Sequence, residues 1–545
     1  MYEIPQQLEY KEKIVFGLTF KQLAYALLFF PIIFILLFKI GAPLWVRIML
    51  SIIPILFAVG FMFFDLSTLI KNWYTWFKLR DLNTNEKLSK ALPIGTISDN
   101  LIHYKNKKIA VLRVNSINFA MKHKEEKDVI ALAFQKFLNS IDFPLQILMT
   151  TETLSLNEYL NSIESQGLSG RHSKIFESYK NHMKYLVENN SAMNRSFYVV
   201  IPETSDINIQ IKLCEERLHS LNLHSFRLGD DSLRKVFSKT FQLNEEHLLP
   251  NRIENFPSHL VAHEMKTQKE LDNEFEQGIL NIIIEEIDDF EFIINEEMLV
   301  EIKYLREWIE WNLEKEKYHR ILYAHGYPRS VENGFLDKIV SCSGNFDFSL
   351  HINPYPIEQM MIRLNKELQK QRADLYSAKL KNQLNPSLEI KYQDTRSTLE
   401  RLQKGDEKLF DVSLYIHCRA DNEEDLTLLT RKIESQLNSL LIIPRKPNFR
   451  MLDGLKSCQP LAKNYLGAKR NITTTALSAF FPFTSSFQKF DKSGVWLGID
   501  SNNIPIIKDI FSLSNPNGVV LAQSGGGKSY FCKLLITRYL LNGTK

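Results

Sequence analysis

Two long apolar runs near the amino end constrain the architecture of this chain more than any other feature. Leu23 to Phe38 and Ile48 to Phe64 contain no charged residue. Each run is close to the ~17–25 residues that a helix needs to cross a lipid bilayer. We therefore predict an N-terminal transmembrane helical hairpin, with helices at about 23–40 and 46–64.

The residues between the runs suit a hairpin. Gly41 and Pro43 favour a tight turn, and Lys39 and Arg47 at the inner ends can extend toward the headgroups and lengthen the effective span. A pair of buried core helices is the alternative, but core helices normally carry a polar stripe and these runs carry none. A signal peptide fits poorly, because a long polar stretch precedes the first run and a second span follows it.

Basic residues predict how the hairpin is oriented. They are more frequent at the outer ends of the two runs than in the connector, so the positive-inside rule places both termini and the main body in the cytoplasm, at the cell membrane. The outer basic residues are Lys11, Lys13, Lys21, Lys71, Lys78 and Arg80. An aromatic belt is expected where the second helix leaves the membrane, formed by Trp73, Tyr74, Trp76 and Phe77.

The segment that leads into the first run has a recognisable pattern. It reads Ile4-Pro5-Gln6-Gln7-Leu8, Tyr10-Lys11-Glu12-Lys13-Ile14, Phe16-Gly17-Leu18-Thr19 and Lys21-Gln22-Leu23. This resembles the start of PrgI-family proteins, which are small two-span membrane subunits of type IV secretion systems. The resemblance implies that residues 1–80 form a PrgI-like membrane segment.

Composition sets limits on function. A formal net charge of +4 over 545 residues is nearly balanced, so bulk charge does not indicate nucleic-acid binding, and a DNA-binding surface would have to be a local patch. The cysteines are scattered without metal-ligand spacing, which favours reduced thiols in cytosolic domains. They are Cys214, Cys342, Cys418, Cys458 and Cys532.

The middle of the chain alternates between strand-like and helix-like patterns. Strands are predicted at 109–114, 145–149 and 197–201, and helices at 123–141, 174–189 and 209–223. A similar order recurs with strands at 318–324, 346–352 and 409–417 and a helix at 424–440, capped by Asp421. A long charged helix is expected from Ile357 to about Leu384. We predict two cytoplasmic α+β units with ferredoxin-like ordering, at residues 81–295 and 296–465.

Two features of this body are predicted to have structural rather than functional roles. The acidic stretch around Glu285, Glu286, Asp288 and Asp289 lacks a Ca²⁺-loop pattern and is predicted to be a solvated face. His351 and His417 lie in strand-like segments without metal-ligand spacing, so we expect hydrogen-bonded structural histidines rather than ligands or bases.

The one chemically explicit motif lies at the far end. Gly518 to Leu521 is predicted to be a short buried strand, and Tyr530 to Leu541 a helix. Between them is the phosphate-binding loop pattern, with alanine where the first glycine commonly stands. The nucleotide-binding residues predicted from this motif are Ala522, Gln523, Ser524, Gly525, Gly526, Gly527, Lys528, Ser529 and Tyr530.

The residue types explain how such a loop binds ATP. Consecutive glycines let the backbone N–H groups point at phosphate oxygens, and the following helix adds the positive end of its dipole. Lys528 would reach the β- and γ-phosphates, and the Ser529 hydroxyl would bind Mg²⁺. A glycine-rich turn that binds no nucleotide is the alternative, but a strand before the loop and a helix after it make this less favoured.

Segments around the motif resemble a second family. They are Gly326 to Arg329, Arg419 to Glu424, Asn471 to Leu477, Phe480 to Ser485, Gly494, Leu497-Gly498, Pro505 and Asp509 to Leu513. Together they are similar to the TraC-like ATPases of type IV secretion and conjugation systems. The resemblance implies a RecA-like P-loop NTPase domain beginning at 466–545, a ring-like and hexameric assembly of the full-length protein, other secretion subunits as membrane partners, and a DNA or protein substrate.

A phosphate-binding loop alone does not hydrolyse ATP. Hydrolysis also needs an acidic residue on a later strand (the Walker B residue), and only 17 residues follow Lys528. We therefore expect the motor domain to continue beyond Lys545 and the catalytic residues to lie there. Two other functions stay open: a membrane-tethered DNA translocase of the HerA or FtsK type, and a non-catalytic membrane scaffold of the secretion apparatus.

Overall fold

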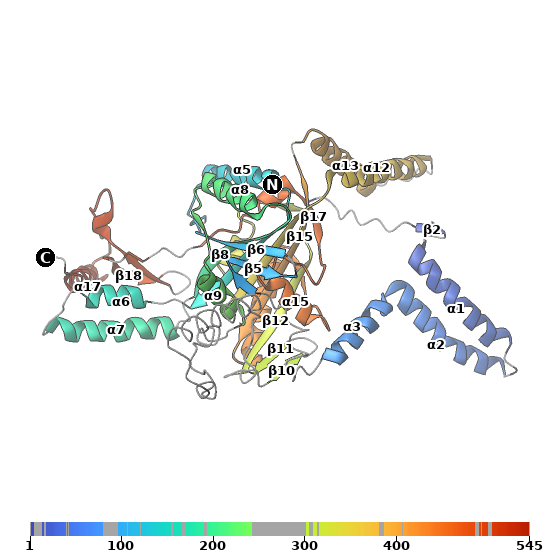
Figure 1. Ribbon diagram of the computed structural model, residues 1–545, viewed down its shortest axis with the longest axis horizontal. Helices are drawn as coiled ribbons and strands as arrows, with labels where there is room; N and C mark the ends of the chain where they lie inside the picture. Colours follow the sequence, from blue (N-terminus) through green and yellow to red (C-terminus); the bar gives the residue numbers. More distant parts are fainter. Residues whose placement is uncertain are drawn as a thin grey trace, which may run out of the picture.

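The structure is a computed structural model of the 545-residue chain. It describes residues 2–4, 13–15, 18–39, 41, 43–79, 96–105, 107–119, 121–153, 156–165, 171–189, 193–241, 301–304, 309–312, 316–380, 386–405, 407–485, 490–491, 493–499 and 504–543. A mixed α/β body is built on one large antiparallel sheet (Figure 1). Two apolar helices extend from one side of this body, and the carboxyl-terminal segment extends from the other.

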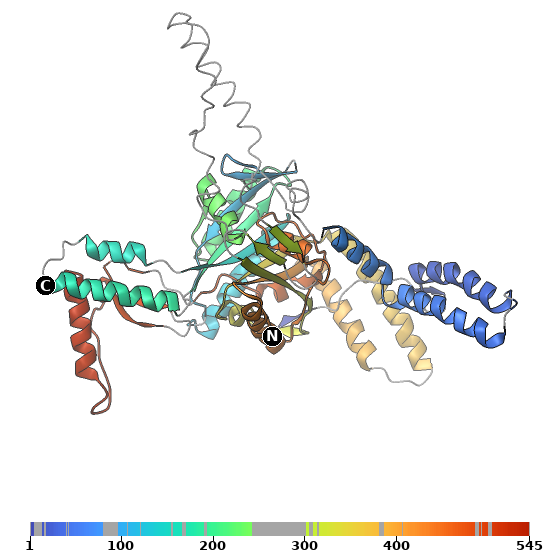
Figure 2. The same ribbon diagram turned by 90° about the horizontal axis from the view of Figure 1, so that it is seen from below.

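Helices α1 (Phe20–Phe38) and α2 (Leu44–Phe63) coincide with the two predicted spans, and each begins a few residues earlier than predicted. Both are long and apolar enough to cross a membrane. Their most apolar windows are 0% and 11% buried, unlike the core helices of a soluble protein. The pair stands clear of the body in both views, which favours membrane association (Figures 1 and 2).

The large sheet has the strand order β10-β11-β12-β15-β14-β7-β8-β6-β5-β4, with β16 paired to β12, β17 to β15 and β9 to β6. Its first half in sequence contains β4 (Thr96–Ser98), β5 (Leu101–Tyr104), β6 (Lys107–Val114), β7 (Leu145–Thr153), β8 (Met193–Pro202) and β9 (Ser225–Arg227). The second half contains β10 (Glu301–Tyr304), β11 (Ile309–Asn312), β12 (Glu316–Gly326), β14 (Phe346–Pro354), β15 (Leu409–Ala420), β16 (Ile443–Arg445) and β17 (Arg470–Thr473).

The two halves share one topology. In the first, α5 (Lys124–Ser140) connects β6 to β7 and α8 (Ile207–Ser220) connects β8 to β9, in the spatial order β9-β6-β8-β7. In the second, the short α11 (Asp337–Val340) lies between β12 and β14 and α14 (Glu423–Ser439) connects β15 to β16, in the order β16-β12-β15-β14. Both are the β-α-β-β-α-β arrangement of a ferredoxin-like motif, as the sequence predicts.

The two halves meet edge to edge, so they form one sheet rather than two. Strands β7 and β14 pair antiparallel, with Met149 opposite Phe348 and Leu145 opposite Ile352. Arg195 on β8 also crosses this junction, because its guanidinium donates to the carbonyl of Cys342 at 2.7 Å and to that of Gly344 at 3.1 Å.

A helical hairpin replaces the tight turn between the second and third strands in each half. The first half inserts α6 (Asn157–Glu164) and α7 (Arg171–Asn189), and the second inserts α12 (Ile357–Leu380) and α13 (Pro386–Gln403). They project in different directions from the body (Figures 1 and 2). Helix α12 confirms the long helix predicted from Ile357 to about Leu384, whereas α13 was not predicted. The first helix ends at Leu380, and a new one begins at Pro386, where a proline suits a helix start but not a helix interior.

The sheet is covered on both faces. Apolar side chains of α5, α8 and α14 pack on one face together with a cluster of buried aromatic rings, among them Phe134, Phe481 and Phe483. Helix α9 (Asp230–Phe241) packs against the other face in the first half. Helix α15 (Met451–Cys458) covers that face in the second half, where Gly454 lies against Ile321.

The amino end is tied to the body. Strand β1 (Tyr2–Glu3) pairs with β13 (Ser330–Val331), and the Ile4 amide donates to the carbonyl of Arg329 at 2.8 Å. Ile4 is buried in the main core. The amino end of the chain is therefore held against the body.

The helix cap predicted at Asp421 is wrong. The N-cap of α14 is Asn422, not Asp421, because the Asn422 carboxamide oxygen accepts from the Asp425 amide at 2.7 Å; Asp421 instead pairs with Lys317. The acidic stretch at 285–289 lies outside the described residues.

Candidate functional site

The glycine-rich loop has a backbone conformation that only glycine adopts without strain. Gly525 and Gly527 both have φ of +80°, in the left-handed region. The Gly526 amide donates to the carbonyl of Gln523 at 3.0 Å, and a Cβ at Gly526 would lie 3.0 Å from that same oxygen. The three glycines therefore hold a tight turn that larger residues would disturb.

Helix α17 (Lys528–Leu541) starts directly from this turn. Its N-cap is Gly527, which has no side chain to accept a hydrogen bond from the first turn. The first amides of a helix have no partner within the helix, so they are free to bind an anion, and the helix dipole favours negative charge there. Lys528 and Ser529 are exposed at this end. The local geometry fits a phosphate group.

The predicted strand before the loop is absent. Residues 514–523 form no regular structure, and Val519 and Leu521 are 84% and 88% exposed. A strand needs a neighbouring strand for its backbone groups, and within the described residues nothing pairs with this segment. The prediction from the apolar run Gly518 to Leu521 is thus wrong for this structure.

Helix α17 is held by a small hairpin of β18 (Val495–Ile499) and β19 (Pro505–Lys508). The Arg538 guanidinium lies 4.1 Å from the ring centroid of Trp496, and it donates to the Trp496 carbonyl. The Asn542 carboxamide donates to the carbonyls of Ser493 and Gly494 at 2.8 and 2.6 Å. Burial lowers the pKa of Arg538, which nevertheless stays a cation because it starts from the very high value of a guanidinium.

The same hairpin packs on the inserted helices of the first half. Leu541 and Ile507 belong to a buried cluster with side chains of α6 and α7, and the Trp496 ring lies 5.6 Å from that of His182. In this cluster the hydroxyls of Tyr159 and Tyr179 are 3.0 Å apart, and burial raises the pKa of both phenols. The α6–α7 hairpin therefore connects the glycine-rich loop to the sheet.

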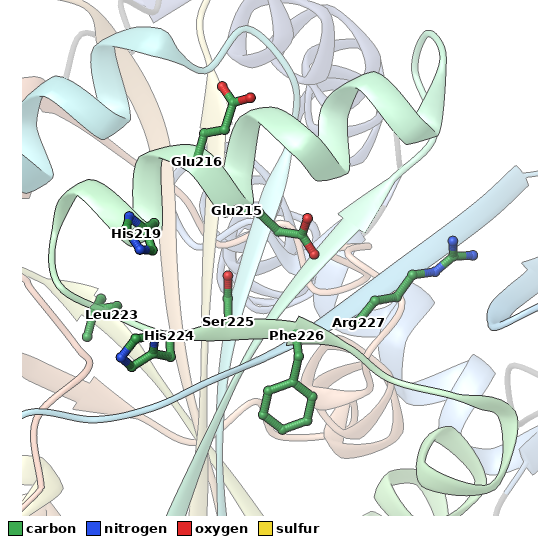
Figure 3. Close-up of a pocket in the computed structure, with 8 residues that line it drawn as sticks. All are labelled: Glu215, Glu216, His219, Leu223, His224, Ser225, Phe226 and Arg227. Carbon is green, nitrogen blue, oxygen red and sulfur yellow. The ribbon is translucent and has the colours of Figure 1, made fainter.

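A shallow depression of about 540 Å³ lies elsewhere, between α8 and β9 (Figure 3). Glu215, Glu216 and His219 line it from the helix, and Arg227 from the strand. The Arg227 guanidinium is already hydrogen bonded within the protein, since it donates to the carbonyls of Asp99 and Asn100. The described residues contain no group of three or more potential ligands placed to hold a metal ion. This depression has no feature that identifies a ligand.

The structure also reveals a buried polar layer that the sequence patterns do not indicate. Under α15, the Asp347 carboxylate accepts from the Arg419 guanidinium at 2.6 Å and from the Thr151 amide at 2.7 Å. A His319 ring nitrogen lies 2.9 Å from one of His417. Burial, with the nearby Arg419 charge, lowers the pKa of His319 to about 3, and burial lowers that of His417 as well. Both rings are therefore neutral at pH 7.

His351 and His417 have structural positions, as predicted. The His351 Nε2–H donates to the Ser457 carbonyl at 2.7 Å, which anchors α15 on the sheet, and burial lowers the pKa of His351 to about 4. Both histidines are at most 1% exposed, so no substrate reaches them.

The five cysteines are free thiols, and only Cys532 on α17 is exposed.

Comparison with models of known protein families finds a match over part of the chain. Residues 97–223 match the family model described as Archaeal TraC-like domain. The match runs from β4 to the end of α8 and so covers most of the first half of the sheet and the inserted α6–α7 hairpin. No curated protein matches the chain. The match supports a relationship to TraC-like proteins and suggests an ATPase family related to type IV secretion.

Proposed function

We propose that this protein is a membrane-anchored ATPase subunit of a type IV secretion or conjugation system, which binds ATP and Mg²⁺ at residues 522–530. The main support is the TraC-like match at 97–223 in a chain that also contains a glycine-rich loop at a helix start. ATP binding would energise assembly of the apparatus or transfer of a DNA or protein substrate.

The proposed roles follow from the loop. Positive φ at Gly525 and Gly527 and the uncapped first turn of α17 suit a polyphosphate, which backbone amides bind. Lys528 supplies a compact positive charge to the phosphates, and the Ser529 hydroxyl supplies a ligand to Mg²⁺. Ala522, Gln523, Ser524, Gly526 and Tyr530 complete the loop around them.

The remaining parts of the motor belong to the same proposal. We expect a RecA-like domain that continues past Lys545, where further strands and an acidic Walker B residue would complete the catalytic site. Strands that flank Gly518 to Leu521 would also bury the exposed Val519 and Leu521. An open reading frame that runs on past Lys545 to a hydrophobic strand ending in acidic residues would support this, and a stop codon directly after Lys545 would contradict it.

We propose that the first 80 residues attach the protein to the membrane. A PrgI-like hairpin of α1 and α2 would span the cell membrane twice, with both termini and the body in the cytoplasm. It would bring the protein to other membrane subunits of the apparatus. A ring, expected to be a hexamer, would form through the complete motor domains.

Two other functions are weaker candidates. A HerA- or FtsK-like DNA translocase would share the loop, but the body matches a TraC-like model instead. A non-catalytic scaffold would need only the membrane hairpin and the body, and the exposed loop would then be without a role.

Complementation of a deletion strain separates these functions. Lys528→Ala should abolish substrate transfer while the protein stays in the membrane fraction. Lys533→Ala, an exposed lysine further along the same helix, is the matched control and should transfer normally. Deletion of residues 1–80 should release the protein from membranes. Normal transfer by Lys528→Ala would refute the ATPase function and favour the scaffold.

A further inference from the structure

Helix α3 (Leu66–Leu79) directly follows the second apolar helix and has two distinct faces. Leu66, Ile70, Trp73 and Phe77 recur at spacings of three and four residues, which places them along one side of the helix. The opposite side carries hydroxyl and lysine side chains. These are Ser67, Thr68, Lys71, Thr75 and Lys78.

The apolar side of α3 is open. Ile70, Trp73 and Phe77 are 45%, 48% and 59% exposed, and the neighbouring Tyr74 is 63% exposed. The Trp73 and Phe77 rings stack on each other, with centroids 5.7 Å apart. A continuous aromatic face of this kind indicates an interaction surface, because soluble proteins seldom expose one to water.

The chain changes direction where α2 ends. Asp65 has a φ of +47° and separates the two helices, and its carbonyl accepts from the Thr68 amide at 2.9 Å to start α3. Figure 1 shows α3 turning sharply away from α2. Asp65 also pairs with Lys21 at the start of α1, at 3.0 Å. This exposed ion pair marks the level at which the apolar part of the α1–α2 hairpin ends.

We propose that α3 lies along the cytoplasmic surface of the membrane, with Leu66, Ile70, Trp73 and Phe77 inserted at the level of the lipid headgroups. The inference rests on the proposed membrane hairpin, since α3 continues from it. Tryptophan and tyrosine favour this interfacial layer, and an amphipathic helix binds there by burying its apolar face. Lys71 and Lys78 suit a bilayer with anionic lipids.

One aromatic residue of α3 is turned to the body instead. Trp76 packs edge-on against Phe449, with ring centroids 5.3 Å apart. Phe449 follows the basic residues Arg445 and Lys446, in the segment after β16. The interfacial helix would therefore hold this basic edge of the sheet next to the anionic membrane surface and fix the distance between membrane and body.

Site-specific fluorescence tests the orientation of α3. The full chain, with Cys532→Ser to remove the one exposed thiol, receives a single new cysteine at Phe77→Cys, or at Thr75→Cys as the matched control on the opposite side. Each is labelled with an environment-sensitive fluorophore in vesicles of phosphatidylcholine and phosphatidylglycerol. Ile70→Cys serves as a second reporter of the apolar side.

The proposal predicts blue-shifted emission at positions 70 and 77, quenched several-fold more by spin-labelled lipids near the headgroups than by those near the bilayer centre. Position 75 should emit as in water. Water-like emission at both 70 and 77 would overturn the proposal, and so would stronger quenching from the bilayer centre. Resistance of the protein to carbonate extraction tests the α1–α2 hairpin separately, so loss of the anchor and misplacement of α3 are distinguishable.

Discussion

Removal of the Asp347 carboxylate tests how the two halves of the sheet are joined. Asp347 lies on β14 at the junction and is 1% exposed. It accepts from the backbone of β7 through Thr151 and from Arg419 on β15. Asp347→Ala would leave the Arg419 guanidinium, 3% exposed, without its carboxylate.

Asp347→Ala is expected to lower the free energy of unfolding strongly, because the ion pair is buried. Removing one partner of such a pair lowers the free energy of unfolding by about 3–5 kcal/mol, since the other charge stays in the interior without its counter-charge. Each 1 kcal/mol lowers the melting temperature by about 2–4 °C in a cooperative unit of about 150–250 residues. Asp347→Ala should therefore lower the melting temperature by roughly 6–20 °C.

The assay is thermal unfolding of the full chain in detergent, followed by circular dichroism. Glu400→Ala is the control, because it removes an exposed partner of Arg396 and should shift the melting temperature by less than about 2 °C. The double substitution Asp347→Leu with Arg419→Met should recover most of the loss, since it removes both charges together. A melting temperature for Asp347→Ala within about 2 °C of the wild type would refute the reasoning.

Three further outcomes are expected. Because burial lowers the pKa of His351 to about 4, the folded state binds fewer protons than the unfolded state below pH 6.5. The contribution of neutral His351 to the free energy of unfolding is full above pH 6.5 and falls toward pH 4, by up to about 1.4 kcal/mol per pH unit. His351→Gln should make the free energy of unfolding, measured by urea titration, less dependent on pH in this range. Gly527→Ala forces a side chain into a φ of +80° and should weaken ATP binding about 10-fold; Gly405→Ala, at +75° and away from the loop, should leave binding unchanged. Trp496→Ala should increase hydrogen exchange in α17 but not in α5, because it removes the ring on which Arg538 stacks.

Local patterns predicted most elements of the body, but not how its halves combine. The apolar strands from Ile109 to His417 and the helices between them follow from hydrophobic periodicity. The pairing of β7 with β14 joins residues about 200 positions apart. Edge-to-edge pairing depends on which strand edges are free in three dimensions, and no local sequence signal carries that information.

The buried polar layer illustrates a second limit. Strand β14 reads Phe-Asp-Phe-Ser-Leu-His-Ile, which alternates in the way typical of a strand with one face in water. Helix α15 covers that face instead, so Asp347, Ser349 and His351 are buried and hydrogen bonded to neighbours. Alternation alone does not distinguish a solvated face from a covered polar one.

The glycine-rich loop depends on a different kind of signal, and nucleotide binding by it stays a prediction. Its glycines, lysine and serine follow one another in the chain, so the motif needs no tertiary information, and the start of α17 at Lys528 fits it. The strand predicted at Gly518 to Leu521 failed because a strand depends on partners from elsewhere in the chain. Short local motifs are therefore predictable here, whereas features that depend on distant neighbours are not.

Equilibrium binding of a fluorescent ATP analogue to the full chain, with and without Mg²⁺, tests the central claim most directly. We predict saturable binding by the wild type and by Lys533→Ala. Lys528→Ala should weaken binding about 10–100-fold, as expected for loss of a charge-assisted hydrogen bond worth about 1.5–3 kcal/mol. Equal affinity in Lys528→Ala and the wild type, or no binding by either, would contradict a nucleotide site at residues 522–530.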